Sequence, residues 1–267
     1  KLVSESQSAF MSDRLISDNI LVAFETLHHL KTKTKGKTGF MAIKLDMSKA
    51  YDRVEWAFLE KVMEKLGFDN RWITLVSSCI RSVSFSVLVN GESHGNFTPN
   101  RGLRQGDPLS PYLFLLCAEG LHSLIQQAEI SGSIKGVSLC STGPKVSHLF
   151  FADDSLLFCR ANSQEVSSIM EILKQYEEAS GQQINREKTQ LFFSPNTDPH
   201  VQEEIKTLLG VATTTNYEKY LGLPSFVGRG KKQSFGYIRE RIWHKMQGWK
   251  ERLLSQGERE VLIKAVL

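Results

Sequence analysis

The chain has 267 residues, of which 41% are hydrophobic and 23% are charged, and its formal net charge is +4. Such a composition is ordinary for a globular protein, and the length allows one large core or two smaller units. The longest apolar run, around 112–118, is too short to span a bilayer, and the first residues lack the pattern of a signal peptide. We therefore expect neither a membrane-spanning protein nor a membrane partner.

Four cysteines are present, at positions 79, 117, 140 and 159. Their spacing lacks the close pairs of a zinc site, and three of them lie in apolar runs. We therefore expect buried free thiols in a protein from a reducing compartment.

Positive charge is concentrated toward the C-terminus. Residues 225–267 contain ten Lys or Arg and four Glu, a net charge of +6, which leaves −2 on the remaining 224 residues. A basic segment on a near-neutral body suits a polyanionic partner, and a solvated helix face explains the same charge equally well. The chain begins without Met and stops within a helical pattern at 261–267, so we expect it to be a segment of a longer polypeptide.

The spacing of apolar residues and turn residues predicts a series of helices and strands. The first part of the chain is expected to form a helix at 16–30, a basic loop at 31–37, a strand at 39–46, a helix at 54–66 and a strand at 84–89 that enters a hairpin turn at Asn90-Gly91. A polar loop at 99–108, a mostly apolar helix at 109–128, hairpin strands at 146–151 and 156–159 and a helix at 163–180 follow. The last part is expected to form a strand at 191–194, a helix at 198–210, a strand at 217–221 and a basic helix at 236–254. Asn162 and Gly181 are expected to cap the helix between them. Helices alternating with few strands predict an α+β body followed by a helical tail.

Two adjacent carboxylates, Asp153 and Asp154, lie between apolar runs at the tip of the hairpin predicted over 146–159. Burial of the flanking runs draws both acids toward the protein body, where paired like charges are costly. A divalent cation bound through hard oxygen ligands resolves that cost. Asp46 ends another predicted strand and is a third carboxylate in similar surroundings. Three acids and a pair of metal ions would suit phosphoryl transfer.

Tyr51 lies five residues after Asp46, before the helix predicted at 54–66. Its flat ring can lie beside whatever Asp46 binds. An Asx turn for Asp46 and a core position for Tyr51 remain an equally good interpretation of this segment taken alone.

A loop rich in glycine and arginine precedes the apolar helix. Gly102 and Gly106 allow the backbone to approach a flat ligand closely, and Arg101 and Arg104 match phosphate geometry. Gln105 offers both a donor and an acceptor. Further along, Lys188 follows a helix stop and can reach a phosphate or donate a proton, although an ordinary surface lysine fits the same pattern.

Together these segments resemble the ordered motifs of reverse transcriptases from non-LTR (LINE-type, plant-like) retrotransposons. LDMSKAYDRV at 45–54 resembles the first catalytic-aspartate motif, and RGLRQGDPLSP at 101–111 resembles the loop and helix under the nascent base pair. FADD at 151–154 resembles the metal-binding hairpin, and GQQINREKT at 181–189 resembles the lysine motif that follows it. Residues 220–222 are similar to a primer-grip motif, and residues 7–19 resemble a motif on the fingers side. The resemblance covers nearly the whole chain.

The resemblance implies the α+β fold of a right-hand polymerase palm, an antiparallel sheet with packed helices, accompanied by partial fingers and a helical, truncated thumb. It places partial fingers at 1–38, the palm with some fingers elements at 39–224, and the start of the thumb at 225–267. The basic helix would then grip the template–primer backbone through salt-dependent phosphate contacts.

The resemblance also implies a role for each motif residue. Asp46, Asp153 and Asp154, with the backbone carbonyl of Met47, would hold two Mg²⁺ ions, with Mn²⁺ as an alternative.

Around the bound nucleotide, Tyr51 would act as a steric gate against a 2′-hydroxyl, and Gln105 would touch the sugar. Gly106 would let the base pair lie close, Arg104 would bind substrate, and Lys188 would be a general acid for pyrophosphate.

By this resemblance the parent polypeptide is an RNA-directed DNA polymerase. It would add dNTPs to a DNA primer on an RNA template, inside the cell and in the nucleus, where the family carries out target-primed synthesis. No upstream Arg-Pro fingers motif, endonuclease domain or Cys/His knuckle is present in the sequence, so we expect synthesis from the parent rather than from this segment alone.

Three other interpretations stay open. An RNA-dependent RNA polymerase shares the carboxylates, although Tyr51 argues against it. A group II intron maturase is a second relative. An inactive, RNA-binding relic of a retrotransposon is the third, although the retained carboxylates, Tyr51, Gln105 and Lys188 argue against decay.

Overall fold

The computed structural model describes residues 2–140, 143–211, 219–224, 235–250, 255–257, 260–261 and 264. The chain forms two compact units, residues 1–217 and 218–267. The first unit contains all of the predicted motifs except residues 220–222.

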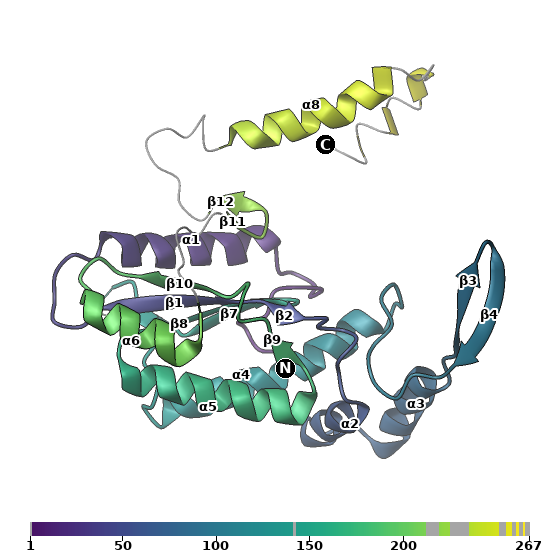
Figure 1. The fold of residues 1–267 in the computed structure, drawn as a ribbon, viewed down its shortest axis with the longest axis horizontal. Coiled ribbons are helices and arrows are strands. Elements are labelled where there is room, and N and C mark those ends of the chain that lie inside the picture. Colours follow the sequence, from purple (N-terminus) through teal and green to yellow (C-terminus); the bar gives the residue numbers. More distant parts are fainter. Residues whose placement is uncertain are drawn as a thin grey trace. The chain divides into compact units, whose positions relative to one another are not determined.

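A four-stranded antiparallel sheet is the centre of the first unit (Figure 1). Its strands run in the order β10 (Gln190–Phe193), β1 (Phe40–Leu45), β8 (Asp154–Arg160) and β7 (His148–Phe151). β1 is paired on both sides, with Met41 opposite Phe193 of β10 and Leu45 opposite Ser155 of β8. A strand paired on both edges and buried on both faces is fixed in register, because a slip of one residue would exchange its two faces.

Helices cover both faces of this sheet. α1 (Ile16–Thr32) lies over one face, and three helices lie over the other (Figure 1). The three are α4 (Ser110–Ile130), α5 (Ser163–Ser180) and α6 (Pro199–Leu209). The main core lies on this second side, where alternate β1 residues such as Ile43 pack with Leu121 of α4 and Ile169 of α5. The α+β architecture predicted from the sequence is therefore confirmed.

A second core lies beside the sheet. It joins α2 (Trp56–Lys65) and α3 (Asn70–Arg81) to the first turns of α4. Phe114, at the start of α4, is 2% exposed and belongs to this cluster. The sequence analysis did not identify α3, which begins at an Asp69 cap whose carboxylate accepts a hydrogen bond from the Arg71 N–H at 2.8 Å.

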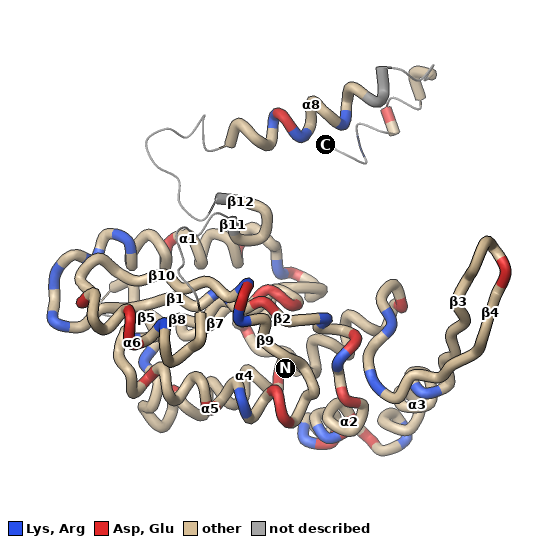
Figure 2. The backbone as a smooth tube through the Cα atoms, in the orientation of Figure 1, with Lys and Arg blue, Asp and Glu red and all other residues tan. Residues whose placement is uncertain are grey.

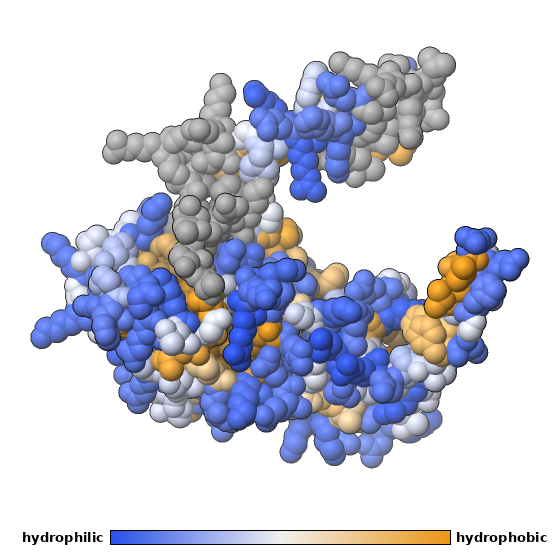
Figure 3. Space-filling model, in the orientation of Figure 1, coloured by the Kyte–Doolittle hydropathy of each residue, from blue (hydrophilic) through white to orange (hydrophobic). Residues whose placement is uncertain are grey.

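A two-stranded ribbon follows α3. It consists of β3 (Phe85–Val89) and β4 (Glu92–Phe97), joined by Asn90-Gly91. Both turn residues have positive φ, 50° and 87°, as a type I′ turn requires, so the predicted hairpin is confirmed. Much of the ribbon is exposed (Figure 3). Its exposed apolar residues are Val87, Leu88, Val89 and Phe97.

Several short elements complete the described chain. In the first unit they are β2 (Met47–Ser48) with β9 (Gln183–Ile184), and β5 (Val137–Ser138) with β6 (Lys145–Val146). The second unit contains β11 (Lys219–Tyr220), β12 (Leu223–Pro224) and α8 (Gly236–Lys250), and the Tyr237 hydroxyl donates a hydrogen bond to the Gly222 carbonyl. None of the described helices is both long enough and apolar enough to cross a membrane.

Local capping signals predicted two helices closely. α5 spans the predicted residues, the Asn162 side chain accepts a hydrogen bond from the Glu165 N–H at 2.8 Å, and Gly181 ends the helix at φ +74°. α6 begins after an Asp198 cap and ends before Gly210 at φ +64°. Glycine is suited to both ends because it adopts the left-handed region without steric cost.

Other boundaries differ from the predictions. α1 extends two residues further than expected, to Thr32, and α2 begins at Trp56 rather than 54. Of the strand predicted at 217–221, Tyr217 and Glu218 lie outside the described residues, as do residues 251–254 of the predicted basic helix.

The prediction that the cysteines are buried holds for only two of them. All four thiols are free, and Cys117 and Cys159 are buried, so that burial raises the pKa of Cys117 to about 12. Cys79 and Cys140 are exposed, because Cys79 lies on the outer side of α3 and Cys140 follows the short strand β5.

The Asn162 cap provides a test of the fold. Replacing Asn162 with Ala removes the acceptor for the Glu165 N–H, so the free energy of unfolding should fall by about 1 kcal/mol in urea denaturation. Asn162→Asp keeps an acceptor and is the matched control. Equal stabilities of the Ala and Asp variants would contradict the capping role.

Candidate active site

The turn between β7 and β8 presents the two adjacent carboxylates. Phe151 pairs with Asp154, so that Ala152 and Asp153 form a two-residue turn. Ala152 has φ +52°, a left-handed conformation that costs a residue with a side chain about 1–2 kcal/mol. Asp153 is exposed at the tip, while Asp154 is half-buried as the first residue of β8. The two adjacent carboxylates therefore differ in burial, and a strained residue precedes them.

Asp46 lies at the same edge of the sheet. It follows Leu45, which pairs with Ser155, the residue after Asp154. Burial raises the pKa of the Asp154 carboxyl, the charges of Asp153 and Asp46 raise it further, and the Lys44 ammonium opposes the shift. Lys44 Nζ lies 3.8 Å from Asp154 Oδ1. The structure therefore brings the three predicted carboxylates to one edge, with one cation against them.

The oxygen atoms at this edge are of the type that binds a divalent metal ion. Asp46, Asp153, Asp154 and the Met47 carbonyl supply the hard oxygens that Mg²⁺ prefers. Within the described ranges, however, no three His, Cys, Asp or Glu side chains form a group able to hold a metal ion. The carboxylates are therefore neighbours that act on one another electrostatically without forming a closed set of metal ligands.

Tyr51 lies close to these acids. Its ring stacks on Phe114 of α4, with 4.6 Å between ring centroids and an interplanar angle of 10°. Burial raises the pKa of the Tyr51 hydroxyl, and the negative charge of Asp153 raises it further. The ring is therefore held by an aromatic partner beside the carboxylate edge, and its hydroxyl stays protonated at neutral pH.

Backbone hydrogen bonds attach the lysine motif to the same edge. Met47 pairs with Ile184, and the Asn185 N–H donates to the Asp46 carbonyl at 2.8 Å. Lys188 is exposed on the following turn, where its N–H donates to the Asn185 carbonyl at 3.2 Å. The predicted lysine is thus on a segment bonded directly to the Asp46 backbone.

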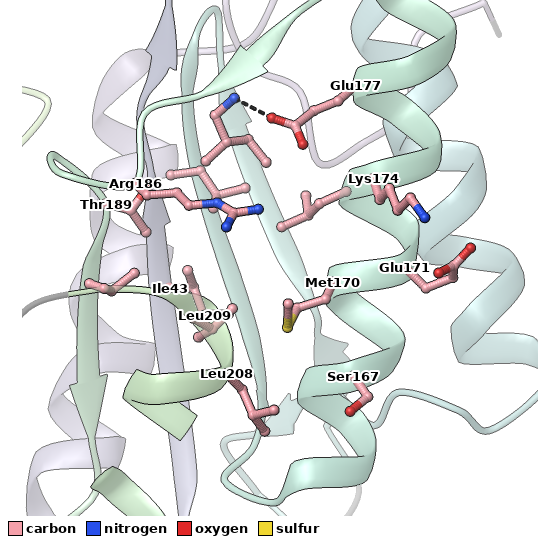
Figure 4. A pocket seen from close by; sticks show the side chains of 14 residues that line it. Ile43, Ser167, Met170, Glu171, Lys174, Glu177, Arg186, Thr189, Leu208 and Leu209 are labelled. Carbon is pink, nitrogen blue, oxygen red and sulfur yellow. Dashed lines mark hydrogen bonds between the residues drawn. The ribbon is translucent and has the colours of Figure 1, made fainter. Parts of the chain in front are cut away.

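Behind this edge lies a largely apolar pocket (Figure 4). Ile43 and Leu45 of β1 line it together with side chains of α5 and α6, including Met170 and Leu209, and its volume is about 350 Å³. At its rim, Glu177 of α5 accepts a hydrogen bond from the Ile184 N–H at 2.7 Å. The segment paired with Met47 is therefore also anchored to α5.

Hydrogen bonds join the loop at 101–108 to the segment from Tyr51 to Trp56. The Gly102 N–H donates to the Val54 carbonyl and the Leu103 N–H to the Tyr51 carbonyl, both at 2.8 Å. Trp56 Nε1 donates to the Gly102 carbonyl at 2.8 Å. Gly102 has φ +91°, and a Cβ there would lie 2.7 Å from the Asp52 carbonyl oxygen. Only glycine allows the two segments to approach this closely.

Three of the residues predicted to bind substrate are exposed on this loop. They are Arg104, Gln105 and Gly106. Arg104 Nη2 lies 2.8 Å from Asp107 Oδ2, and Asp107 Oδ1 accepts a hydrogen bond from the Leu109 N–H before α4. Arg104 and Gln105 line a hollow of about 480 Å³ between the loop and α3. The loop therefore presents polar groups to a space large enough for a base.

Two residues of this region were not identified from the sequence. Phe114 carried no distinct signal, because an aromatic residue in an apolar helix is ordinary core. Lys44 did carry one, since strand alternation places it on the same face as Asp46.

Gly102 and Gly106 give a matched test of how this loop is held. Both have positive φ, 91° and 86°, but a Cβ at Gly106 would meet nothing within 4 Å. Gly106→Ala should lower the free energy of unfolding by about 1–2 kcal/mol, from backbone strain alone.

Gly102→Ala adds a collision with the Asp52 backbone, so it should be more destabilising than Gly106→Ala by roughly 1 kcal/mol or more. Urea denaturation of both variants measures the difference. Equal losses would mean that the loop does not depend on close approach at Gly102.

Comparison with known proteins finds a matching family and several similar proteins. Residues 1–225 match the family described as reverse transcriptase (RNA-dependent DNA polymerase). An uncharacterized mitochondrial protein of Arabidopsis thaliana is 50% identical over 68 residues, 26% of this chain and 56% of that protein. The retrovirus-related Pol polyprotein from the type-1 retrotransposable element R2 of Popillia japonica is 28% identical over 162 residues, 60% of this chain and 25% of that protein.

A solved structure is similar in fold. Telomerase from Candida albicans, in complex with a TWJ fragment of telomeric RNA, matches with a TM-score of 0.50 at 20% identity, covering 72% of this chain and 32% of the telomerase chain. The chain thus spans only part of each of these proteins.

Proposed function

Because the chain belongs to the reverse transcriptase (RNA-dependent DNA polymerase) family, we propose that it is the polymerase core of a non-LTR retrotransposon protein that copies RNA into DNA. The family match confirms the resemblance found in the motif order, and the fold similarity to telomerase confirms the predicted right-hand polymerase architecture. The similarity to an R2 polyprotein supports the non-LTR assignment, and the RNA bound in the telomerase structure supports an RNA template.

The observation that carries the proposal is the convergence of Asp46, Asp153 and Asp154 at one sheet edge beside Tyr51. With the Met47 carbonyl they would hold two Mg²⁺ or Mn²⁺ ions, which when bound would activate the primer 3′-hydroxyl and neutralise the triphosphate and leaving pyrophosphate. Lys44 lies against Asp154 and offsets part of the negative charge at this edge.

Other residues would orient the incoming nucleotide. Tyr51, held flat against Phe114, occupies the space of a 2′-hydroxyl and selects dNTP over rNTP. Arg104 and Gln105 bind its phosphates and sugar from the loop, and Gly106 leaves room for the base pair. Lys188 donates a proton to the departing pyrophosphate.

In this proposal residues 1–38 are partial fingers, 39–224 the palm and 225–267 the start of the thumb. Basic residues of α8, such as Arg239 and Arg241, contact the template–primer backbone. The protein acts in the nucleus, where target-primed synthesis takes place.

The direct test is primer extension on a poly(rA)–oligo(dT) duplex with dTTP and Mg²⁺. Because the chain spans only part of its relatives, the longer polypeptide that carries it is assayed alongside. Asp153→Asn should lower the extension rate roughly a hundredfold or more, since it removes a charged ligand without changing side-chain size. Asp52→Asn, the same change at an exposed acid nearby, is the control.

Extension at an unchanged rate by the Asp153 variant would remove it from the metal site. A folded wild-type protein that binds the duplex and extends nothing would favour the inactive relic.

The steric gate has its own readout. Tyr51→Ala should raise rNTP use relative to dNTP by about tenfold or more, because it opens the space a 2′-hydroxyl needs. Phe114→Leu should raise the same ratio less, since it removes only the ring that positions Tyr51. Tyr112→Ala, at an exposed tyrosine of α4, is the control. An unchanged ratio for Tyr51→Ala would make this tyrosine a packing residue.

A further inference from the structure

The loop between α1 and β1 concentrates positive charge far from the carboxylates. It carries Lys33, Lys35 and Lys37 at alternate positions after Lys31 in the last turn of α1, and no acidic residue lies between Glu25 and Asp46 in the sequence. In Figure 2 it is the blue segment at the left, where the chain passes from α1 to β1. β1 has six residues between this loop and Asp46, a separation of about 20 Å.

Hydrogen bonds hold the loop in one conformation. Asn196 Nδ2 donates to the carbonyls of Lys35 at 3.4 Å, Gly36 at 3.1 Å and Thr38 at 3.0 Å. Ser194 Oγ donates to Asn196 Oδ1 at 2.7 Å and accepts a hydrogen bond from the Phe40 N–H at 2.8 Å. The backbone of the loop is therefore fixed to the segment after β10, so its lysines lie on an ordered stretch of chain.

Lys35 and Lys37 carry charge that no carboxylate in the described part of the chain neutralises. Lys35 and Lys37 are exposed and have no carboxylate within 4 Å there, while Lys33 lies over the Phe40 ring at 4.9 Å. The negative end of the α1 dipole accounts for basic residues in its last turn. It does not account for Lys35 and Lys37, because the dipole effect fades within one turn.

A hollow of about 670 Å³ adjoins the loop. Lys37 and Arg160 line it, and Arg160 Nε is buried with no hydrogen-bond partner among the described residues. Its nearest carboxylate oxygen, Glu165 Oε1, is 4.0 Å away. Asp198 also lines the hollow, but its carboxylate accepts the His200 N–H as the cap of α6. The cations here therefore outnumber the acids that are free to pair with them.

We propose that the loop at 33–37 and the adjoining hollow bind the phosphate backbone of single-stranded RNA. The inference rests on the proposed function, in which the template is RNA. At about 20 Å from the carboxylates, the bound RNA is a stretch outside the reacting position. Such a contact recognises charge and not sequence, so it would hold template RNA to the protein during synthesis.

The test uses the 267-residue chain and a labelled single-stranded RNA of about 30 nucleotides, with affinity measured by fluorescence anisotropy across a salt series. The double variant Lys35→Gln/Lys37→Gln should bind on the order of tenfold more weakly at 0.1 M salt. Its slope of log affinity against log salt should be shallower by about 1.4, since each phosphate contact on a single strand contributes about 0.7.

The control is Lys65→Gln/Lys174→Gln, which removes the same charge from two other exposed lysines. It should keep the wild-type slope. A Lys35/Lys37 variant with wild-type affinity and slope would overturn the proposal and leave the loop as a cap for α1 or a contact for an acidic protein. Primer extension separates the RNA-binding role of the loop from the proposed polymerase function. If RNA binding depends on the loop but no protein extends the primer, the RNA-binding role is supported and only the polymerase function is contradicted.

Discussion

The antiparallel pairing of β1 with β8 is the constraint on which the rest of the candidate site depends. It sets Asp46 beside the first residues of β8, and the two-residue turn before β8 then adds Asp153. Three carboxylates meet because two strands are in register. Burial raises the pKa of the Asp154 carboxyl, and the charges of Asp153 and Asp46 raise it further. Lys44 offsets a part of the charge from within the same strand. The negative charge that remains at this edge of the sheet favours the binding of a cation.

The remaining parts of the site are attached to this pairing mainly by the backbone. Asn185 donates to the Asp46 carbonyl, Leu103 donates to the Tyr51 carbonyl, and Gly102 donates to Val54. Backbone hydrogen bonds thus fix the positions of segments that are distant in sequence. A backbone frame of this kind positions groups more accurately than side-chain contacts between loops do.

Features set by local chemistry were predictable from the sequence. The caps at Asn162 and Gly181 depend on residues within one turn, and so does the Asn90-Gly91 hairpin. Helix α3 does carry an apolar stripe at helical spacing, Ile73, Val76 and Ile80, but Trp72 and Leu75 interrupt the pattern in the sequence and are exposed in the structure. Its position depends on packing against α2 and α4, which is a tertiary effect.

The membership of the family followed from the order of motifs, but the site's arrangement did not. No pattern in the sequence indicates that Phe114 stacks on Tyr51, since the two lie on different elements. The burial of cysteines was overestimated for the same reason, because an apolar neighbourhood in sequence does not fix which side of a helix faces the core. The roles of Asp46, Tyr51, Gln105 and Lys188 remain predictions carried by resemblance and by their position.

The β3–β4 ribbon has a consequence for the behaviour of the isolated chain. It is a sheet of only two strands in the described structure, so both outer edges present backbone donors and acceptors, beside the exposed Val87, Leu88 and Val89. Such an edge is a template for strand addition by another molecule. Glu92 and His94 on β4 oppose this only weakly through charge. In concentrated solution, the ribbon therefore offers a surface for intermolecular β-pairing.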